Sequence, residues 1–324
     1  MHLVIFSICL NEDKTIGELL DRMPTKIKGI DKITKIVIDD GSEDKTAQIA
    51  KEHGAIVISN YSQKKLAYSF QVAVDKALEI GADMAVNIDG DLQFMPEEIP
   101  ELVKPIVDNK ADFVAADRFH QKGKRIRIKP ENMPPAKYYG NIIGTYILSK
   151  LAKKQFSDVT CGFRAYSRNT LMNLNILSSF TYTQESFQIL ALKNFRITQI
   201  PVSIKYYPGR KSRVVTSIIN YLVTSATNII RTFRDNAPLR FFGIIGIFFS
   251  ILSVLAGFIP LYRIIETGTI TPYKYLGLIS IFLFSVSILF LLFGLLADIF
   301  TRVIANQERI IVLLKESKYS KQKK

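Results

Sequence analysis

Two apolar runs near the C-terminus constrain this chain more than any other feature. Residues 241–262 and 275–297 contain no Asp, Glu, Lys or Arg. Each run is long enough to cross a hydrocarbon core of about 30 Å as a helix, which takes about 20 residues. Buried helices of a soluble domain are the alternative, but two such runs joined by a short linker favour a pair of membrane-spanning helices.

Basic residues lie on the outer flanks of these two runs, whereas the linker holds only Arg263 and Lys274, with Glu266. Because positive flanks stay on the cytoplasmic side, we expect a multi-pass protein of the cell membrane with residues 1–240 and the tail in the cytoplasm. The net charge of +14 suits an anionic lipid surface. The flanking residues are Arg231, Arg234 and Arg240 before the first run, and Arg302, Arg309, Lys315, Lys318, Lys321, Lys323 and Lys324 after the second.

The N-terminal part alternates between short apolar segments and segments with helical patterns. This alternation predicts an α/β fold in which helices cover both faces of a mainly parallel, Rossmann-like sheet. In such sheets a ligand binds beyond the carboxyl ends of the strands. The expected strands are 3–9, 33–39, 55–59, 84–89 and 112–116, and the expected helices are 14–27, 42–53, 64–80 and 96–108.

The chain divides into four predicted parts. They are a catalytic domain (1–212), an amphipathic juxtamembrane helix (213–238), a two-helix transmembrane region (239–300) and a basic cytoplasmic tail (301–324). The amphipathic helix is predicted because apolar residues recur at helical spacing from Val215 to Phe233. Its apolar stripe fits a core position and a position in the lipid headgroup layer equally well.

Acidic side chains follow two of the predicted strands. Asp89, Asp91 and Gln93 are spaced two apart, so in an extended chain their side chains point the same way. Carboxylate and amide oxygens suit Mg²⁺ or Mn²⁺, and we predict a metal site there, with simple turn and capping residues as the alternative. At the other strand end, Asp39 and Asp40 can accept hydrogen bonds from a nucleobase or ribose, and Ser42 is expected to cap the next helix.

Other classes of site find little support. The two cysteines, Cys9 and Cys161, exclude a disulfide scaffold and a Cys-rich zinc site and favour a reducing compartment. The three histidines are scattered, so we expect neither a His-based metal cluster nor a catalytic triad, and no histidine near the motifs. No glycine-rich dinucleotide fingerprint and no P-loop lysine are present. A basic stretch at 122–129 reads as a long mobile loop.

The strand-end motifs together resemble those of family 2 glycosyltransferases. They are similar above all to the dolichyl- and polyprenyl-phosphate glycosyltransferases of the dolichol-phosphate mannose synthase type, over residues 1 to about 213 and the paired apolar runs. The resemblance implies a GT-A fold, a UDP- or GDP-linked sugar donor and a lipid-phosphate acceptor. The motifs are Asn11-Glu12, Asp39-Asp40-Gly41-Ser42-x-Asp44-x-Thr46, Asp89-x-Asp91-x-Gln93 and Cys161-Gly162-Phe163-Arg164.

The resemblance also implies roles for single residues. Asp91, Asp158 and Arg118 are expected to be catalytic, with Arg118 on phosphate and Asp158 near the acceptor. Asp89, Asp91 and Gln93 would hold the cation. Nucleotide-sugar binding is expected of Asn11, Glu12, Asp39, Asp40, Asp89, Gln93 and Arg164. The family's Arg-x-x-x-Ser pattern is replaced by 128–132, which leaves the acceptor-phosphate residue open among Arg118, Arg125, Arg127, Lys129, Lys137, Lys205, Lys211 and Arg213.

The expected reaction is an inverting transfer of the sugar to a polyprenyl phosphate, either undecaprenyl or dolichyl. A lipid phosphate is already an anion at pH 7, so no strong general base is required. A membrane-anchored transferase with a soluble or non-phosphate acceptor, and a non-catalytic nucleotide-sugar-binding partner, remain alternatives. A processive polysaccharide synthase is disfavoured because the chain has no tryptophan, and no nucleic-acid-binding motif is present. Self-association through the Phe- and Leu-rich spans stays open.

Overall fold

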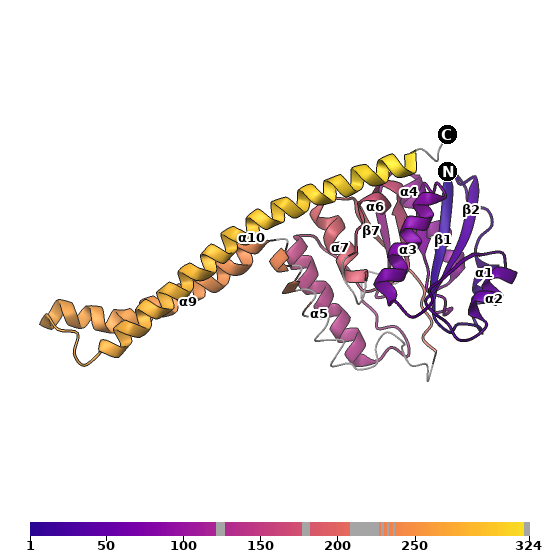
Figure 1. Ribbon diagram of the computed structural model, residues 1–324. Coiled ribbons are helices and arrows are strands. Elements are labelled where there is room, and N and C mark those ends of the chain that lie inside the picture. The colour runs from indigo at the N-terminus through magenta and orange to yellow at the C-terminus, as the bar shows by residue number, and fades with distance from the viewer. Residues whose placement is uncertain are drawn as a thin grey trace. The chain divides into compact units, whose positions relative to one another are not determined.

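A single mixed sheet forms the centre of the N-terminal domain in the computed structural model (Figure 1). Within the described residues it has seven strands in the order β3-β2-β1-β4-β6-β5-β7, and all are parallel except β6. The structure describes residues 1–120, 127–176, 182–207, 227, 230–231, 233–235 and 237–320. The strands are β1 (His2–Cys9), β2 (Lys32–Asp39), β3 (Ile56–Ser59), β4 (Met84–Asn87), β5 (Phe113–Asp117), β6 (Arg164–Ser167) and β7 (Ile197–Pro201).

Helices cover both faces of this sheet, as the alternation of apolar and helical segments predicts. Each expected helix is present, although 96–108 begins as a short 3-10 turn before its α-helix. The helical elements are α1 (Ile16–Arg22), α2 (Thr46–Glu52), α3 (Leu66–Glu79), η1 (Pro96–Glu98), α4 (Ile99–Val107), α5 (Pro135–Ala152), α6 (Arg168–Asn173), α7 (Thr183–Leu192), α9 (Pro238–Thr267) and α10 (Lys274–Ser320).

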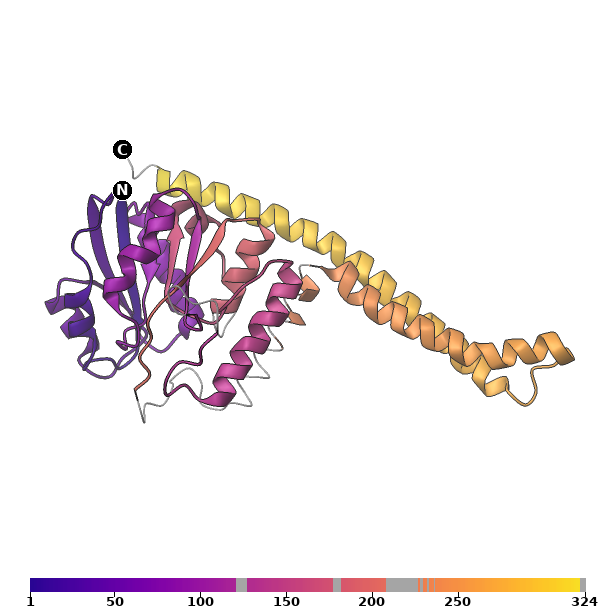
Figure 2. The same cartoon turned by 180° about the vertical axis from the view of Figure 1, so that it is seen from behind.

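Successive residues of each central strand pack into different cores. In β1, Leu3 and Ile5 face α1, α2 and α4, whereas Val4 and Phe6 face α3, α6 and α7. These side chains are fully buried, and the period of two follows from the pleat of the strand. The two helix layers can be followed from opposite sides in Figure 1 and Figure 2. The predicted α/β fold with a mainly parallel sheet is therefore confirmed.

The chain divides into two compact units, one of Met1–Asn228 with Val312–Lys324 and one of Ile229–Ile311. In the second unit α9 and α10 are long and apolar enough to cross a membrane. They are joined by reciprocal hydrogen bonds, in which the Ser253 hydroxyl donates to the Ser280 carbonyl (2.8 Å) and the Ser280 hydroxyl to the Ser253 carbonyl (2.9 Å). Gly246 lets the helices approach, because a Cβ there would meet Leu291 at 3.2 Å. Small residues and hydroxyls of this kind are common where membrane helices pack.

Two predicted boundaries can be compared with the structure only in part. Most of the expected amphipathic helix at 213–238 lies outside the described residues. The expected basic tail from residue 301 is not a separate element, because α10 continues as a helix to Ser320.

Candidate active site

One edge of the sheet gathers the predicted site residues. The carboxyl ends of β1, β2, β4, β5 and β7 lie at this edge, and so does the start of the antiparallel strand β6. The segments that follow or precede these ends carry Asp39, Asp89, Arg118, Asp158 and Tyr206. Chain order and strand direction alone therefore bring distant parts of the sequence to one place.

Asp89 and Asp91 approach each other through a turn rather than through an extended strand. The predicted strand 84–89 ends at Asn87, and residues 90–93 turn with Leu92 at φ 57°. The Asp91 carboxylate accepts a hydrogen bond from the Gln93 backbone N–H (3.1 Å). The extended conformation predicted for residues 89–93 is therefore wrong, although Asp89 and Asp91 lie close enough to interact.

The charge of Asp91 affects the ionisation of Asp89. Burial and the neighbouring charge of Asp91 raise the pKa of Asp89 to about 7, and Arg118, Lys137 and Arg164 oppose that rise. Asp89 keeps part of its side chain exposed to solvent. Two acidic groups forced together beside several basic ones are characteristic of a functional site rather than of a stabilising ion pair.

The Asp89 carboxylate lies directly over a glycine. A Cβ on Gly162 would meet the two Asp89 oxygens at 3.0 and 3.2 Å and the Tyr182 hydroxyl at 3.2 Å. Below it, the Asn87 amide nitrogen donates to the Gly162 carbonyl (2.8 Å) and to the Tyr182 hydroxyl. The segment before β6 therefore packs against the Asp89 carboxylate and restricts its position.

We expect Gly162→Ala to lower the turnover of this site by about 10- to 100-fold, because moving a reacting group by about 1 Å can cost that much. The matched control is Gly144→Ala, whose Cβ would meet only the Gln184 amide nitrogen, at an ordinary 3.8 Å. Activity and thermal stability of the two variants should be measured side by side. Equal activities would show that the close approach of Gly162 to Asp89 is unimportant.

The two aspartates after β2 differ in their surroundings. Asp40 is buried and accepts hydrogen bonds from the Asn60 side chain (2.9 Å), the Ser69 hydroxyl (2.7 Å) and the backbone N–H groups of Lys64 and Lys65 (3.0 and 3.1 Å). Its carboxylate therefore holds the segment before α3 in place. Asp39 is equally buried, and one of its oxygens accepts the Ser42 N–H at 3.0 Å. Because its carboxylate has fewer partners than that of Asp40, Asp39 is the better candidate for a nucleoside.

Ser42 does not cap α2, contrary to our expectation. The helix begins at Thr46, and the Asp44 carboxylate accepts the Thr46 N–H at 2.9 Å. The Ser42 hydroxyl instead accepts the Asn11 N–H (2.9 Å), and the Asn11 side chain accepts the Glu43 N–H (2.9 Å). Asn11 thus ties the loop after β1 to the loop after β2.

Glu12 is part of the same connection. Its backbone N–H donates to the Thr46 hydroxyl (2.7 Å), and its carboxylate accepts the Thr15 hydroxyl (3.1 Å). The Thr15 hydroxyl also lies 2.8 Å from the Gly90 carbonyl. The Asn11-Glu12 motif therefore links three strand ends, and its direct contact with a nucleotide-sugar stays a prediction.

Arg118 and Asp158 form a buried ion pair. The Arg118 Nε and Nη2 atoms donate to the two Asp158 oxygens at 2.6 and 2.9 Å, and the side chains are 6% and 0% exposed. Nη2 also donates to the Thr160 hydroxyl (2.6 Å) and Nη1 to the Tyr206 hydroxyl (3.2 Å). Four of the five guanidinium N–H groups are thus used within the protein.

Arg118 and Asp158 were predicted to contact phosphate and the acceptor, but in the structure they are buried and contact each other. Burial favours a raised pKa for Asp158, but the Arg118 guanidinium and Thr160 hold that pKa below its usual value. Asp158 has no exposed surface with which to contact an acceptor. We therefore regard Asp158 as a positioning residue. In the part of the chain that the structure describes, one N–H group of Arg118 has no partner and could serve a ligand.

Arg164 lies in the protein core and has no exposed surface with which to contact a nucleotide, which argues against its predicted role. It is 0% exposed, and its guanidinium donates to the Cys161 carbonyl (2.6 Å), the Val159 carbonyl (3.0 Å) and the Ser186 hydroxyl. Its charge lies 4.8 Å from the centre of the Phe187 ring. Arg164 therefore shapes the segment 159–162, because carbonyl groups of that segment are its partners.

The basic residues predicted for the acceptor phosphate differ in their distance from the Asp89 and Asp91 carboxylates. Lys137, in the first turn of α5, interacts with both Asp89 and Asp91, and its ammonium lies 5.1 Å from the centre of the Tyr206 ring. Burial and Arg118 lower its pKa, and the carboxylates oppose this. Arg127 and Lys205 are exposed. Arg125, Lys211 and Arg213 lie outside the described residues.

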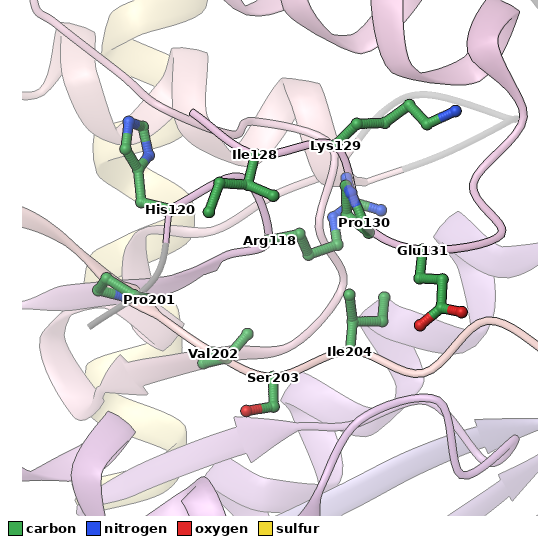
Figure 3. Close-up of a pocket in the computed structure, with 10 residues that line it drawn as sticks. All are labelled: Arg118, His120, Ile128, Lys129, Pro130, Glu131, Pro201, Val202, Ser203 and Ile204. Carbon is green, nitrogen blue, oxygen red and sulfur yellow. The ribbon is translucent and has the colours of Figure 1, made fainter. Parts of the chain in front are cut away.

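A cavity of about 680 Å³ lies on one side of Arg118 (Figure 3). Its wall combines apolar residues with Arg118, Lys129 and His120. The His120 Nδ1 atom lies 2.7 Å from an Asp117 oxygen. We expected no histidine near the motifs, so His120 is a correction. The lining residues are Arg118, His120, Ile128, Lys129, Pro130, Glu131, Pro201, Val202, Ser203 and Ile204.

Two further residues that contact this site, Asn87 and Tyr206, were not predicted from the sequence. Asn87 is the last residue of β4 and donates a hydrogen bond to the Gly162 carbonyl. Tyr206 follows β7, which we did not predict, and it contacts both Arg118 and Lys137. A polar residue closing an apolar strand was the available signal for Asn87, and the paired Tyr206-Tyr207 after an apolar segment was the signal for Tyr206.

The site residues fit a hard divalent cation. Asp89 and Asp91 offer only oxygen donors, which Mg²⁺ and Mn²⁺ prefer. Burial and the charge of Asp91 raise the pKa of Asp89, and a bound cation would favour its ionised form. The Gln93 backbone carbonyl accepts a hydrogen bond from the Lys205 N–H (2.9 Å), and the role of the Gln93 side chain stays a prediction.

Comparison with known proteins finds similarity to glycosyltransferases. The sequence profile of Glycosyl transferase family 2 matches residues 4–174. The UDP-N-acetylglucosamine–dolichyl-phosphate N-acetylglucosaminyltransferase of Methanococcus voltae is 27% identical over 235 residues, which cover 66% of this chain and 89% of that protein. The dolichyl-phosphate hexose transferase of Haloferax volcanii is 29% identical over 204 residues, or 61% of this chain and 81% of that protein.

A solved structure shares the fold. Glucosyl-3-phosphoglycerate synthase from Mycobacterium tuberculosis, in complex with Mn²⁺, UDP and glucosyl-3-phosphoglycerate, superposes with a TM-score of 0.53 at 19% identity. The match covers 72% of this chain and 79% of that one. The expected GT-A-like fold is thereby confirmed.

Proposed function

Because this chain belongs to glycosyl transferase family 2, we propose that it transfers a sugar from a nucleoside diphosphate to the phosphate of a polyprenyl phosphate. The observation that carries this proposal is the position of Lys137 beside Asp89 and Asp91. In this arrangement, a cationic group suited to an anionic acceptor interacts with carboxylates suited to a divalent cation. The named dolichyl-phosphate transferases among the relatives support the same acceptor class.

Donor binding is assigned to the carboxylates at the strand ends. Asp89 and Asp91 would hold Mg²⁺ or Mn²⁺, and Asp39 would accept hydrogen bonds from the nucleoside. When bound, the cation neutralises charge on the diphosphate of the donor. The last N–H group of Arg118 is available to a phosphate oxygen. UDP and GDP both satisfy this arrangement.

Acceptor binding is assigned to the start of α5. Asn141 follows Lys137 by one helical turn on the same face, it is 1% exposed, and neither of its amide atoms has a hydrogen-bond partner in the described part of the protein. We assign Lys137 and Asn141 to the acceptor phosphate. Tyr139, Ile143 and Tyr146 are about 60% exposed on the same helix, as suits contact with the headgroup layer.

The chemistry needs few proton transfers. An oxygen of the acceptor phosphate bonds to the anomeric carbon as the bond from that carbon to the donor diphosphate breaks, so the configuration inverts. Negative charge moves to the leaving diphosphate, where the cationic groups offset it. The attacking phosphate is already ionised, and no general base is required.

Membrane association follows from the two apolar helices and agrees with the acceptors named for the relatives. We further propose that the catalytic domain faces the cytoplasm, because basic residues flank the spans on the side of that domain.

We expect Lys137→Ala to raise the KM for polyprenyl phosphate by about 10- to 100-fold, since a charged hydrogen bond contributes about 1.5–3 kcal/mol. Lys137→Arg should recover part of the loss. The control is Lys150→Ala on the same helix, whose ammonium lies 5.6 Å from the Tyr146 ring centre. A change in the KM for the donor alone would contradict the assignment.

The proposed function is tested with purified chain in detergent, polyprenyl phosphate and a panel of UDP- and GDP-sugars. Mass spectrometry should find a lipid-phosphate sugar from one preferred donor. Transfer to a water-soluble alcohol with none to polyprenyl phosphate would instead support a soluble-acceptor transferase. Donor binding without any transfer would support a non-catalytic role.

A further inference from the structure

The end of α10 belongs to the catalytic domain. α10 is one helix from Lys274 to Ser320, and its residues from Val312 onward fall in the compact unit that contains the sheet. We call residues 312–320 the C-terminal segment. The chemistry proposed at the strand ends does not require this segment, yet it makes apolar and polar contacts with the domain.

Tyr319 is the apolar anchor of this segment. It is only 3% exposed and packs in the core cluster on the α3 and α6 face of the sheet. Its backbone carbonyl accepts from Arg168 Nη2 (3.4 Å), while Arg168 Nη1 donates to the Ala82 carbonyl (2.7 Å). An aromatic ring enclosed this fully contributes much of the apolar contact at an interface.

Lys315 is the polar anchor. Its ammonium donates to the Leu174 carbonyl at 3.0 Å and lies 3.9 Å from the Asp75 carboxylate, and its side chain is 14% exposed. Lys315 and Tyr319 are four residues apart and so share one face of the helix. Glu316, between them, is exposed on another face. The docked face is therefore distinct from the rest of the segment.

The docking surface lies away from the reacting groups. Ala82 precedes β4 and Leu174 follows α6, whereas Asp89 follows the opposite, carboxyl end of β4. The segment thus contacts the catalytic domain at the far end of the strand that carries Asp89.

We propose that the C-terminal segment is a strap: by docking on the catalytic domain, it gives that domain a second attachment to the apolar helices, in addition to the chain before α9, and so favours encounters with a membrane-bound acceptor. The helix is continuous from the apolar run to the strap, so the tie contains no loop. Only the statement about the acceptor rests on the proposed function. Docking through Lys315 and Tyr319 stands independently of it.

Hydrogen exchange of the full chain in lipid nanodiscs tests the docking. We expect slow exchange in 312–320 of the native chain and in the control Leu314→Ala/Glu316→Ala, whose residues are exposed. Lys315→Ala/Tyr319→Ala should speed exchange there at least tenfold, and Tyr319→Phe should not. Unchanged exchange in β1 and β4 shows that the domain remains folded. Equal exchange in the native and double-alanine chains would overturn the proposal.

Activity tests the purpose of the strap. The double-alanine variant should lose about tenfold in transfer to a long polyprenyl phosphate in nanodiscs, because release lowers the effective concentration of the domain at its acceptor. Transfer to a short, water-soluble prenyl phosphate should be unchanged. Equal loss with both acceptors would contradict the membrane-positioning role. If the native chain used neither acceptor, the proposed function would fail while the exchange result still judged the docking.

Discussion

Asp89→Asn and Asp91→Asn are each expected to lower kcat/KM for the nucleotide-sugar by about a thousandfold, the loss typical when charge stabilisation of a leaving group is removed. An amide is nearly the same size as the carboxylate but carries no charge, so it holds a divalent cation poorly. The variants should fold normally, because the raised pKa of Asp89 shows that its ionised form is unfavourable without a cation.

Steady-state kinetics at saturating acceptor, with Mn²⁺ or Mg²⁺ varied, measure this effect. Asp108→Asn is the matched control, since Asp108 lies at the end of α4 and only 3.8 Å from the exposed Lys110. It should keep the native rate within about twofold, as surface substitutions usually do. Losses below tenfold in both site variants would mean that the carboxylates do not serve the reaction.

Arg118→Met should destabilise the catalytic domain by about 3–5 kcal/mol, because it leaves the fully buried Asp158 without its partner. Asp158→Leu alone should cost a similar amount for the same reason. Arg118→Met/Asp158→Leu should recover much of the stability, since two apolar groups can replace a buried ion pair. It should not recover activity, because Tyr206 loses its hydrogen bond from Arg118 and the site loses the guanidinium group proposed to contact phosphate.

Thermal unfolding of the full chain in detergent measures these four proteins. A domain of this size loses about 2–4 °C per kcal/mol. The pH dependence of thermal stability is a second measurement, and stability should fall in acid. The pKa of Asp158 is below its usual value in the folded chain, so its stabilisation is present above about pH 4 and is lost as the pH falls through the folded pKa. If the double variant lost as much stability as the two single variants together, the predicted coupling between Arg118 and Asp158 would be wrong.

Much of the fold could be predicted because it depends on patterns that a sequence displays directly. Alternation of apolar strands and helices locates the sheet, and the strand ends then locate Asp39, Asp89 and Arg118. The two long apolar helices, α9 and α10, follow from run length and absence of charge. These properties depend on chain order rather than on the packing of individual side chains.

The direction in which a motif residue points could not be predicted in the same way. Arg164 and Asp158 belong to one short motif near Gly162, yet both turn inward and support its backbone. Asp40 and Asp39 are adjacent, but only Asp40 is enclosed by donors from a loop twenty residues away. Such partners are set by tertiary packing, and the sequence motif is the same whether a side chain serves the scaffold or the ligand.

The docking of the C-terminal segment could not be predicted from the sequence either. A run of basic residues after the second apolar run reads as a tail, since charge alone does not reveal a docking site. Lys315 and Tyr319 become anchors only because the α3 and α6 face offers Leu174, Asp75 and an apolar cluster.

The central claim is that Asp89 and Asp91 hold a divalent cation while a sugar passes from a nucleoside diphosphate to a lipid phosphate. The most direct measurement is the rate of that transfer by the native chain in excess chelator, followed by stepwise return of free Mn²⁺. We predict no transfer in chelator and full recovery with Mn²⁺. Transfer at the same rate with and without the free cation would contradict the account.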